Sequence, residues 1–236
     1  AWDYVLTQPA GSWQKVFPNS PYPPDCDENG LRADRKQGGS GMTLDDFISH
    51  EYAQTCHFAP EHVVALRLYS TAAFKSIVNP LRDTSRTTPY PFPATIKFIE
   101  QGIRMSRALS MSMNLSRGAN EEISLWRGMK DMARDVPKEF FSKGGVEYAP
   151  MSTTPDLKVA VQYSASQMPM LIRIRTNNWF ERGADISWLS AFPAESECLF
   201  APLTYERVRE VQEKEVRTPS GQVVTFTVVN VDVEVM

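Results

Sequence analysis

Apolar residues recur at helical spacing in the part of the chain that follows residue 42. Thr43 and Asp46 give a capping signal immediately before the first apolar face. A second apolar face opens within residues 63–69, and a third runs from residue 94 to residue 113. The hydrophobic pattern therefore predicts a helical part over residues 42–118.

Beyond this part the apolar runs become short, turn residues bound them, and β-branched residues accumulate towards the C-terminus. A helix with Pro155 just inside its start interrupts these runs. The pattern predicts strands at residues 122–129, 146–153, 169–176, 197–204, 205–216 and 223–235, of which the last two form a hairpin around Pro219, Ser220 and Gly221. Because strands and helices do not alternate regularly, we expect an α+β fold, in which a helical lobe precedes an antiparallel, β-rich half (119–236).

The bulk composition is that of a globular protein. Of 236 residues, 42% are hydrophobic, which is enough apolar material for one large core or two small ones. The first 41 residues are instead rich in Pro, Gly, Asn and Asp. We therefore expect an irregular N-terminal arm (1–41) before a single domain that covers residues 42–236.

Charge and hydropathy argue against two classes of partner. The formal net charge is -3 at pH 7, whereas a domain that binds nucleic acid is usually basic. The sequence has no run of roughly eighteen or more apolar residues, so no transmembrane segment is expected. It also begins without an initiator Met or a charged leader, which favours a soluble domain excised from a longer or secreted protein.

Two short patterns resemble metal sites without completing them. Residues 25–30 (DCDENG) match the first half of a calcium loop, but Lys36 stands where the loop needs a bidentate glutamate. Cys56, His57 and His62 lie close together in the sequence, yet their spacing matches no standard zinc pair on one helix face. No metal ion is therefore expected.

The three cysteines leave the redox compartment open. Cys198 lies inside an apolar run, where a small buried thiol is expected. Cys26 and Cys56 are able to form a disulfide in an oxidising compartment, but two cysteines alone do not decide the matter.

Polar groups interrupt the β-rich half at three separate places where a strand core would prefer apolar residues. They are Arg127 in LWRGM, the hydroxyl run at 152–154, and the pair Glu195 and Glu197. On a strand, residues i and i+2 project to the same face, so the two glutamates are expected to act on one ligand from one side. An arginine on a neighbouring strand is suited to grip a diphosphate through paired donors.

Each of these pieces also has a purely structural interpretation. Arg127 could form a salt bridge, the hydroxyl run could cap a helix, and the two glutamates could mark a solvated strand edge. Two other basic residues of the β-rich half, Arg173 and Arg175, are expected on a solvated strand face rather than in a site.

In their order and spacing, the three pieces resemble the R-S-E class of mono-ADP-ribosyltransferases, which includes animal arginine-specific enzymes and several bacterial toxins. The match covers residues 120–206, and the segment RGADISWLSAFPAESECLFAPLT is especially similar to the family; the helical part matches through ALRLYSTAAFKSIVNPLR. The resemblance implies a helical lobe packed on two antiparallel sheets, which form a split β-sandwich around an NAD cleft.

The resemblance also implies roles for individual residues. Arg127 would hold the NAD diphosphate or the adjacent ribose, and the backbone at Gly128 would bond the nicotinamide amide. Ser152 would brace Glu197 and the nicotinamide ribose. Tyr163 would pack on the nicotinamide ring. Glu197 would be the catalytic glutamate, which stabilises the positive charge that develops as nicotinamide leaves.

Glu195 would recognise the acceptor, because in this family a glutamate two residues before the catalytic one goes with an arginine acceptor. Phe192 would contact the target protein, and Trp179 or Phe180 could share the nicotinamide clamp. Thr154 replaces the last serine of the family's hydroxyl motif and keeps the hydroxyl.

The function implied is the transfer of ADP-ribose from NAD, as substrate, to an arginine of a protein acceptor. The alternatives are an NAD glycohydrolase, in which water replaces the acceptor, and a non-enzymatic NAD-binding module. We expect a monomeric catalytic domain.

Overall fold

The computed structural model describes residues 42–71, 73–115, 122–130, 136–178, 181–217 and 223–234. Several predictions fall outside these residues: the N-terminal arm with its calcium-like loop and Cys26, the alternative clamp residues Trp179 and Phe180, and the hairpin turn at 219–221. The division of the chain into an arm and one domain stays a prediction.

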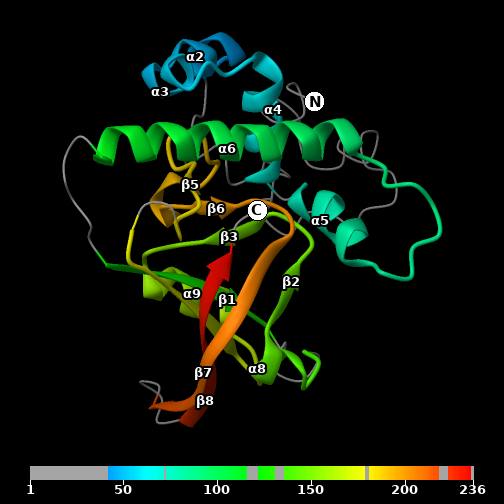
Figure 1. The fold of residues 1–236 in the computed structure, drawn as a ribbon, viewed down its shortest axis with the longest axis vertical. Coiled ribbons are helices and arrows are strands. Elements are labelled where there is room, and N and C mark those ends of the chain that lie inside the picture. The colour runs from blue at the N-terminus through cyan, green and yellow to red at the C-terminus, as the bar shows by residue number, and fades with distance from the viewer. Residues whose placement is uncertain are drawn as a thin grey trace, which may run out of the picture.

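The helical lobe matches the hydrophobic pattern of the first part of the chain. It contains α2 (Leu44–Ser49), α3 (Glu51–Thr55), α4 (Pro60–Tyr69), α5 (Phe74–Arg82) and the long α6 (Pro93–Leu115). The predicted capping box is present, since the Thr43 side chain accepts from the backbone of Asp46 while the Asp46 carboxylate accepts from the backbone of Thr43. In Figure 1, α6 crosses the molecule with α2 and α3 on one side and a small sheet on the other. None of the described helices is long and apolar enough to span a membrane.

The β-rich half contains two sheets, and the expected α+β class is confirmed. A five-stranded sheet has the order β1-β4-β8-β7-β2, and a three-stranded sheet has the order β3-β6-β5. The strands are β1 (Ile123–Met129), β2 (Gly145–Glu147), β3 (Met151–Thr153), β4 (Met170–Thr176), β5 (Ala184–Asp185), β6 (Cys198–Phe200), β7 (Thr204–Arg217) and β8 (Val223–Glu234). The expectation of purely antiparallel sheets was wrong in one pair, because β4 and β8 run parallel.

Two predicted strands are interrupted. Residues 146–153 divide into β2 and β3, which belong to different sheets, and Pro150 lies in the break, where it donates no ladder hydrogen bond. Residues 197–204 likewise divide into β6 and the start of β7. Leu203, in the turn between them, has a positive φ of 63°. The sequence pattern predicted one continuous strand in each segment because the turns that divide them contain apolar residues.

The two sheets share one apolar core. Buried residues of β1, β4 and β8 in the large sheet meet buried residues of β3 and β6 in the small sheet; they include Leu125, Ile172, Val229, Met151 and Phe200. A second core joins the helical lobe to the small sheet and the loop that follows β5. The small sheet is therefore the middle layer, which places its strand ends between the helices and the large sheet (Figure 1).

A buried arginine fixes the helical lobe to the segment before β6. Arg67 of α4 is 1% exposed, and its Nη1 donates to the backbone carbonyls of Leu189 at 2.9 Å and Ser190 at 2.7 Å. The neighbouring hydroxyl of Ser70 accepts from the backbone N–H of Ala191 at 2.9 Å. Since buried backbone carbonyls need donors, these contacts help to define the path of the loop before β6.

A glycine lets α9 (Leu157–Ser164) approach β1 closely. A Cβ atom at Gly128 would lie 1.9 Å from the carbonyl oxygen of Ala160 and 2.8 Å from the backbone nitrogen of Ser164. Real Cβ atoms do not approach backbone atoms so closely, so only glycine fits without displacement of the helix.

Replacing Gly128 with alanine is therefore expected to destabilise the fold. Because the clash involves helix backbone, α9 must shift, and we expect a loss of about 1–3 kcal/mol in the free energy of unfolding. Urea unfolding followed by circular dichroism measures this loss.

Gly145→Ala is the matched control. Its Cβ would meet the ring of Phe140 at 3.1 Å, a side-chain contact that can relax by a small movement. If the two variants lost the same stability, the close approach of α9 would not be the reason for glycine at position 128.

Candidate functional site

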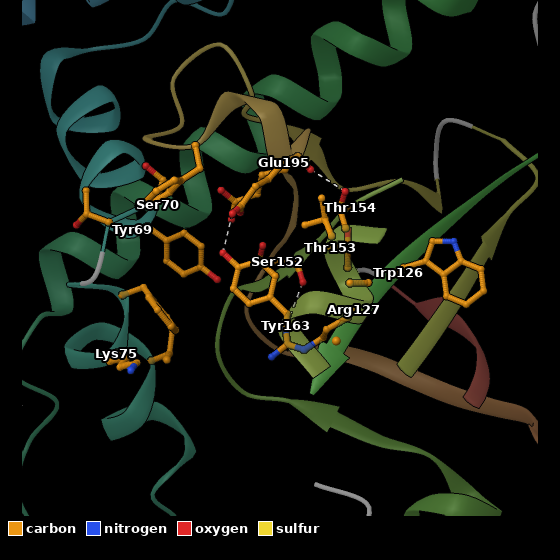
Figure 2. A pocket seen from close by; sticks show the side chains of 18 of the residues that line it. Tyr69, Ser70, Lys75, Trp126, Arg127, Ser152, Thr153, Thr154, Tyr163 and Glu195 are labelled. Carbon is orange, nitrogen blue, oxygen red and sulfur yellow. Dashed lines mark hydrogen bonds between the residues drawn. The ribbon is translucent and has the colours of Figure 1, made fainter. Parts of the chain in front are cut away.

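A cavity of about 470 Å³ opens between the helical lobe and the two sheets. Its lining includes these predicted site residues: Arg127, Gly128, Ser152, Tyr163, Phe192, Glu195 and Glu197. These residues come from β1, β3, α9 and the segment before β6, which are remote in the sequence (Figure 2). The volume is within the range of small-molecule sites in proteins, roughly 300–1,000 Å³.

Two backbone hydrogen bonds hold Arg127 beside Ser152. The N–H of Trp126 donates to the carbonyl of Thr154 at 2.7 Å, and the N–H of Thr154 donates to the carbonyl of Trp126 at 2.9 Å. This isolated bridge joins β1 to the end of β3. Arg127 Nη1 then donates to the Ser152 carbonyl oxygen at 3.5 Å. Figure 2 shows Arg127 and Ser152 next to each other.

Glu197 is the most deeply buried carboxylate of the cavity, with 7% of the residue exposed. The hydroxyl of Ser190 donates to its Oε2 at 3.3 Å, and the Ser152 side chain also hydrogen-bonds the carboxylate. Burial raises the pKa of Glu197 to about 7, the two serine hydroxyls oppose this rise, and the nearby charge of Glu195 adds to it. A solvated strand edge is therefore ruled out for Glu197.

Glu195 does not share a strand with Glu197, which corrects the expected i, i+2 arrangement. It ends a 3-10 turn (η4, Pro193–Glu195), and Ser196 then adopts a left-handed conformation with φ 50°. Pro193 favours this turn because its fixed φ suits the first helical position. The turn nevertheless leaves both carboxylates on the same cavity.

Neighbouring hydroxyls hold the Glu195 segment in place. Tyr163 donates from its hydroxyl to Glu195 Oε1 at 2.8 Å, and Thr154 Oγ1 donates to the Glu195 carbonyl at 2.6 Å (Figure 2). Burial raises the pKa of the Glu195 carboxyl, and the Tyr163 hydrogen bond opposes that rise.

The hydroxyl run at 152–154 does not supply the cap of α9. Asp156 is the N-cap and accepts from the backbone of Lys158 at 2.8 Å, so Pro155 precedes the helix instead of lying inside it. Thr154 contributes a turn, because its hydroxyl accepts from the Asp156 N–H at 3.0 Å. Ser152 lines the cavity, and its side chain hydrogen-bonds Glu197.

Arg127 does form a salt bridge, as its purely structural interpretation predicted, but it also lines the cavity. Its Nη2 lies 3.4 Å from Oε2 of Glu147, and Arg82 pairs with the same carboxylate at 2.7 Å. Arg173 lies outside the cavity lining, with its guanidinium over the Trp126 ring and its Nε donating to Ser124.

Two aromatic residues and a glycine complete the predicted set. Tyr163 is 51% exposed, and its hydroxyl is directed to Glu195. Phe192 is partly buried and begins the turn that carries Glu195. Gly128 lines the cavity and also allows α9 to pack on β1.

The charges that face the cavity are unevenly arranged. Basic side chains come from Lys75, Arg82, Arg127 and Lys130, whereas the acidic ones are Glu195 and Glu197. In Figure 2, Lys75 and Arg127 lie toward one end of the group and Glu195 lies toward the other. Such a cavity suits a ligand with an anionic part and a cationic part.

Sequence reasoning missed three contributors to the site. Ser190 supports Glu197, Glu147 pairs with Arg127, and Tyr69 lies buried at the cavity wall with its hydroxyl on the Pro150 carbonyl at 3.0 Å. Ser190 is a polar residue in an apolar stretch, which was a usable signal. Within the described residues, no group of three or more His, Cys, Asp or Glu side chains is arranged to hold a metal ion.

No protein-family model matches the sequence, and no curated protein matches it at a significant level. Solved structures do resemble the fold. The ADP-ribosyltransferase HopU1 of Pseudomonas syringae pv. Tomato DC3000 superposes with a TM-score of 0.55 and 18% sequence identity, over 81% of this chain and 88% of that chain.

Two further bacterial proteins are similar. The ADP-ribosyltransferase toxin Plx2a from Paenibacillus larvae gives a TM-score of 0.52 at 15% identity, over 80% of this chain and 94% of that chain. The Clostridium limosum C3 exoenzyme gives 0.51 at 15% identity, over 80% and 95%. Likenesses at this level of identity concern the fold, and they agree with the resemblance carried by the sequence motifs. The chain has the fold of the mono-ADP-ribosyltransferase toxins.

Proposed function

We propose that this protein transfers ADP-ribose from NAD to an arginine side chain of a protein acceptor, with release of nicotinamide. The observation that carries the proposal is the convergence of Arg127, Ser152, Glu195 and Glu197 on one cavity. The fold it shares with ADP-ribosyltransferases supports the same conclusion.

NAD has the charge distribution that the cavity matches. Its diphosphate is anionic, and a guanidinium such as that of Arg127 binds phosphate oxygens through a planar pair of donors. The nicotinamide ring is cationic, and the carboxylates of Glu195 and Glu197 lie on the same cavity. With the diphosphate at Arg127 and the ring near the carboxylates, the nicotinamide ribose would lie next to Glu197. The hydrogen bonds of Glu197 to Ser152 and Ser190 fix the orientation of its carboxylate.

The reaction then proceeds through an oxocarbenium-like state. The C–N bond between the ribose and nicotinamide breaks, and its electron pair leaves with nicotinamide, which becomes neutral. The anomeric carbon carries the positive charge that results, and the Glu197 carboxylate stabilises it, as carboxylates do in glycosidases. Nicotinamide needs no proton in order to leave, so no general acid is required.

Glu195 acts on the acceptor. A guanidinium nitrogen attacks the anomeric carbon, a new C–N bond forms, and the proton released by that nitrogen passes to the Glu195 carboxylate. Because burial raises its pKa, Glu195 accepts a proton more readily than an exposed glutamate. Phe192 begins the same turn, and we expect its ring to contact the acceptor protein.

Nicotinamide release measured with and without an acceptor tests the proposal. Agmatine, which carries a guanidinium, is a suitable small acceptor. Release that depends on agmatine or on a protein supports transfer. Equal release in both cases indicates an NAD glycohydrolase. No release under either condition indicates a non-enzymatic binding module and overturns the proposal.

Substitution of the two glutamates should separate their roles. Glu197→Gln removes the charge opposite the developing cation, so both transfer and hydrolysis should fall by about 10²-fold or more. Glu195→Gln removes only the proton acceptor for arginine, so transfer to agmatine should be lost while hydrolysis is retained. Both activities are measured as nicotinamide release and as incorporation of labelled ADP-ribose.

The pair of variants controls for structural damage, since each replaces one carboxylate by an amide of the same shape. If both substitutions reduced hydrolysis equally, the division of labour between Glu195 and Glu197 would be incorrect.

The pH dependence of hydrolysis follows from the pKa of Glu197, which burial raises to about 7. Only the ionised carboxylate stabilises the sugar cation, so kcat/KM should decline as the pH falls through about 7 and level off above it. A pH–rate profile of NAD hydrolysis measures this.

Glu195→Gln is the control for this profile. It keeps Glu197 but removes a neighbouring charge that contributes to the raised pKa, so the decline should persist at a slightly lower pH. Disappearance of the decline in this variant would assign it to Glu195 and contradict the prediction.

A further inference from the structure

One carboxylate behind the cavity wall holds two of the arginines that face the cavity. Glu147, at the end of β2, accepts from Nε of Arg82 at 3.0 Å through Oε1 and from Nη2 of Arg82 at 2.7 Å through Oε2. The same Oε2 accepts from Nη2 of Arg127 at 3.4 Å, and Oε1 accepts from the Ala149 N–H at 3.0 Å. Glu147 therefore joins a helix of the helical lobe to a strand of the large sheet.

Two of these three charged side chains are largely buried, so Arg127 and Glu147 do not form an ordinary surface pair. The side chains of Arg127 and Glu147 are 15% and 14% exposed, while that of Arg82 is 37% exposed. Burial pushes the pKa of Glu147 up, but Arg127 and Arg82 more than offset this effect and hold the pKa below its usual value. Glu147 is thus ionised at neutral pH and tightly held by its two partners.

A second buried carboxylate lies close to this group. Glu206, on β7, is 6% exposed, and its backbone is paired with Gly145 of β2. Burial raises its pKa to about 7, while the nearby charge of Arg127 opposes the rise. The positive charges of Arg82 and Arg127 therefore face Glu147 and Glu206 on their protein side.

Arg82 and Arg127 line the cavity, whereas Glu147 does not. Arg82 uses Nε and Nη2 for Glu147, and within the described residues no protein group accepts a hydrogen bond from its Nη1. The carboxylate thus engages one edge of the guanidinium and leaves donors for a ligand. A guanidinium whose orientation is already fixed loses less conformational entropy when it binds an anion.

We propose that Glu147 is a positioning residue, which holds the guanidinium groups of Arg82 and Arg127 side by side as one preformed site for a dianion of the diphosphate class. The proposal rests on the proposed function, because NAD supplies the diphosphate. It adds Arg82, from the helical lobe, to the residues that bind the substrate, and it assigns to Glu147 the orientation of both cations.

Glu147→Gln tests this proposal, because it should weaken the binding of ligands that carry a diphosphate and leave the binding of nicotinamide unchanged. ADP-ribose contains the diphosphate, whereas nicotinamide does not. The variant should bind ADP-ribose about tenfold more weakly, because an amide replaces a charge-assisted acceptor, and should raise the KM for NAD by a similar factor. Inhibition by nicotinamide and kcat should stay within about twofold of the wild-type protein.

Glu213→Gln is the matched control, since it makes the same chemical change at an exposed position of β7. It should leave the affinity for ADP-ribose unchanged. Calorimetric titration with ADP-ribose gives the dissociation constants directly, and thermal unfolding of each variant shows whether it is folded.

Arg82→Met provides a second, independent variant in case Glu147→Gln does not fold. It should weaken ADP-ribose binding to a similar extent and leave nicotinamide inhibition unchanged. The double variant should be less impaired than the product of the two single effects, because both substitutions disrupt one site.

Unchanged affinity for ADP-ribose in folded Glu147→Gln or Arg82→Met would overturn the proposal. Tighter binding in Glu147→Gln would also overturn it, because Glu147 would then be a competing counter-ion. Failure of the proposed function is distinct: the wild-type protein itself would neither bind ADP-ribose nor release nicotinamide.

Discussion

The paired backbone hydrogen bonds between Trp126 and Thr154 connect the two sheets at the point on which the site depends. One residue beyond Trp126 is Arg127, and two residues before Thr154 is Ser152. Arg127 and Ser152 belong to different sheets, and this bridge holds them next to each other at the cavity. The glutamate segment is tied to the same place, because the Thr154 hydroxyl donates to the Glu195 carbonyl.

The site concentrates buried charge, which a fold tolerates only where partners exist. Glu197 has two serine hydroxyls, Glu147 has two arginines, and Glu195 has Tyr163. These partners do not remove the cost of burial for Glu197, since its pKa stays well above the usual value. In the proposed reaction the sugar cation that develops beside Glu197 would offset this cost of burial in the transition state, while the free protein would still bear it.

Local patterns in the sequence predicted the elements that are determined by residues close together in the chain. The capping box at Thr43, the long helix α6 and the hairpin strands β7 and β8 all lie close to where the periodicity placed them. The three polar pieces also predicted which residues would meet. The parallel pairing of β4 with β8 was not predictable in this way, because register between strands remote in sequence depends on the whole sheet.

Some details of the site were not predictable from the sequence either, because they too depend on contacts between residues that are remote in the sequence. Glu147 and Arg82 are 65 positions apart. Arg82 ends the helical segment ALRLYSTAAFKSIVNPLR that resembles the family, but nothing in that segment points to Glu147, so only their meeting in space marks them as a pair. The two glutamates were correctly placed on one cavity, but a 3-10 turn and a left-handed serine bring them there instead of a strand. Alternation in a short run does not distinguish these two backbones.

The contact of Arg67 with the loop before β6 has a consequence for dissecting the molecule. Its donors satisfy the carbonyls of Leu189 and Ser190, and the Ser190 side chain in turn reaches Glu197. A minimal fragment that begins at β1 would retain Arg127, Ser152 and Glu197, yet it would lack the helical support for the loop that carries Ser190 to Glu197. The helical lobe therefore contributes directly to the geometry of the cavity, because its Arg67 supports the loop from which Ser190 reaches Glu197.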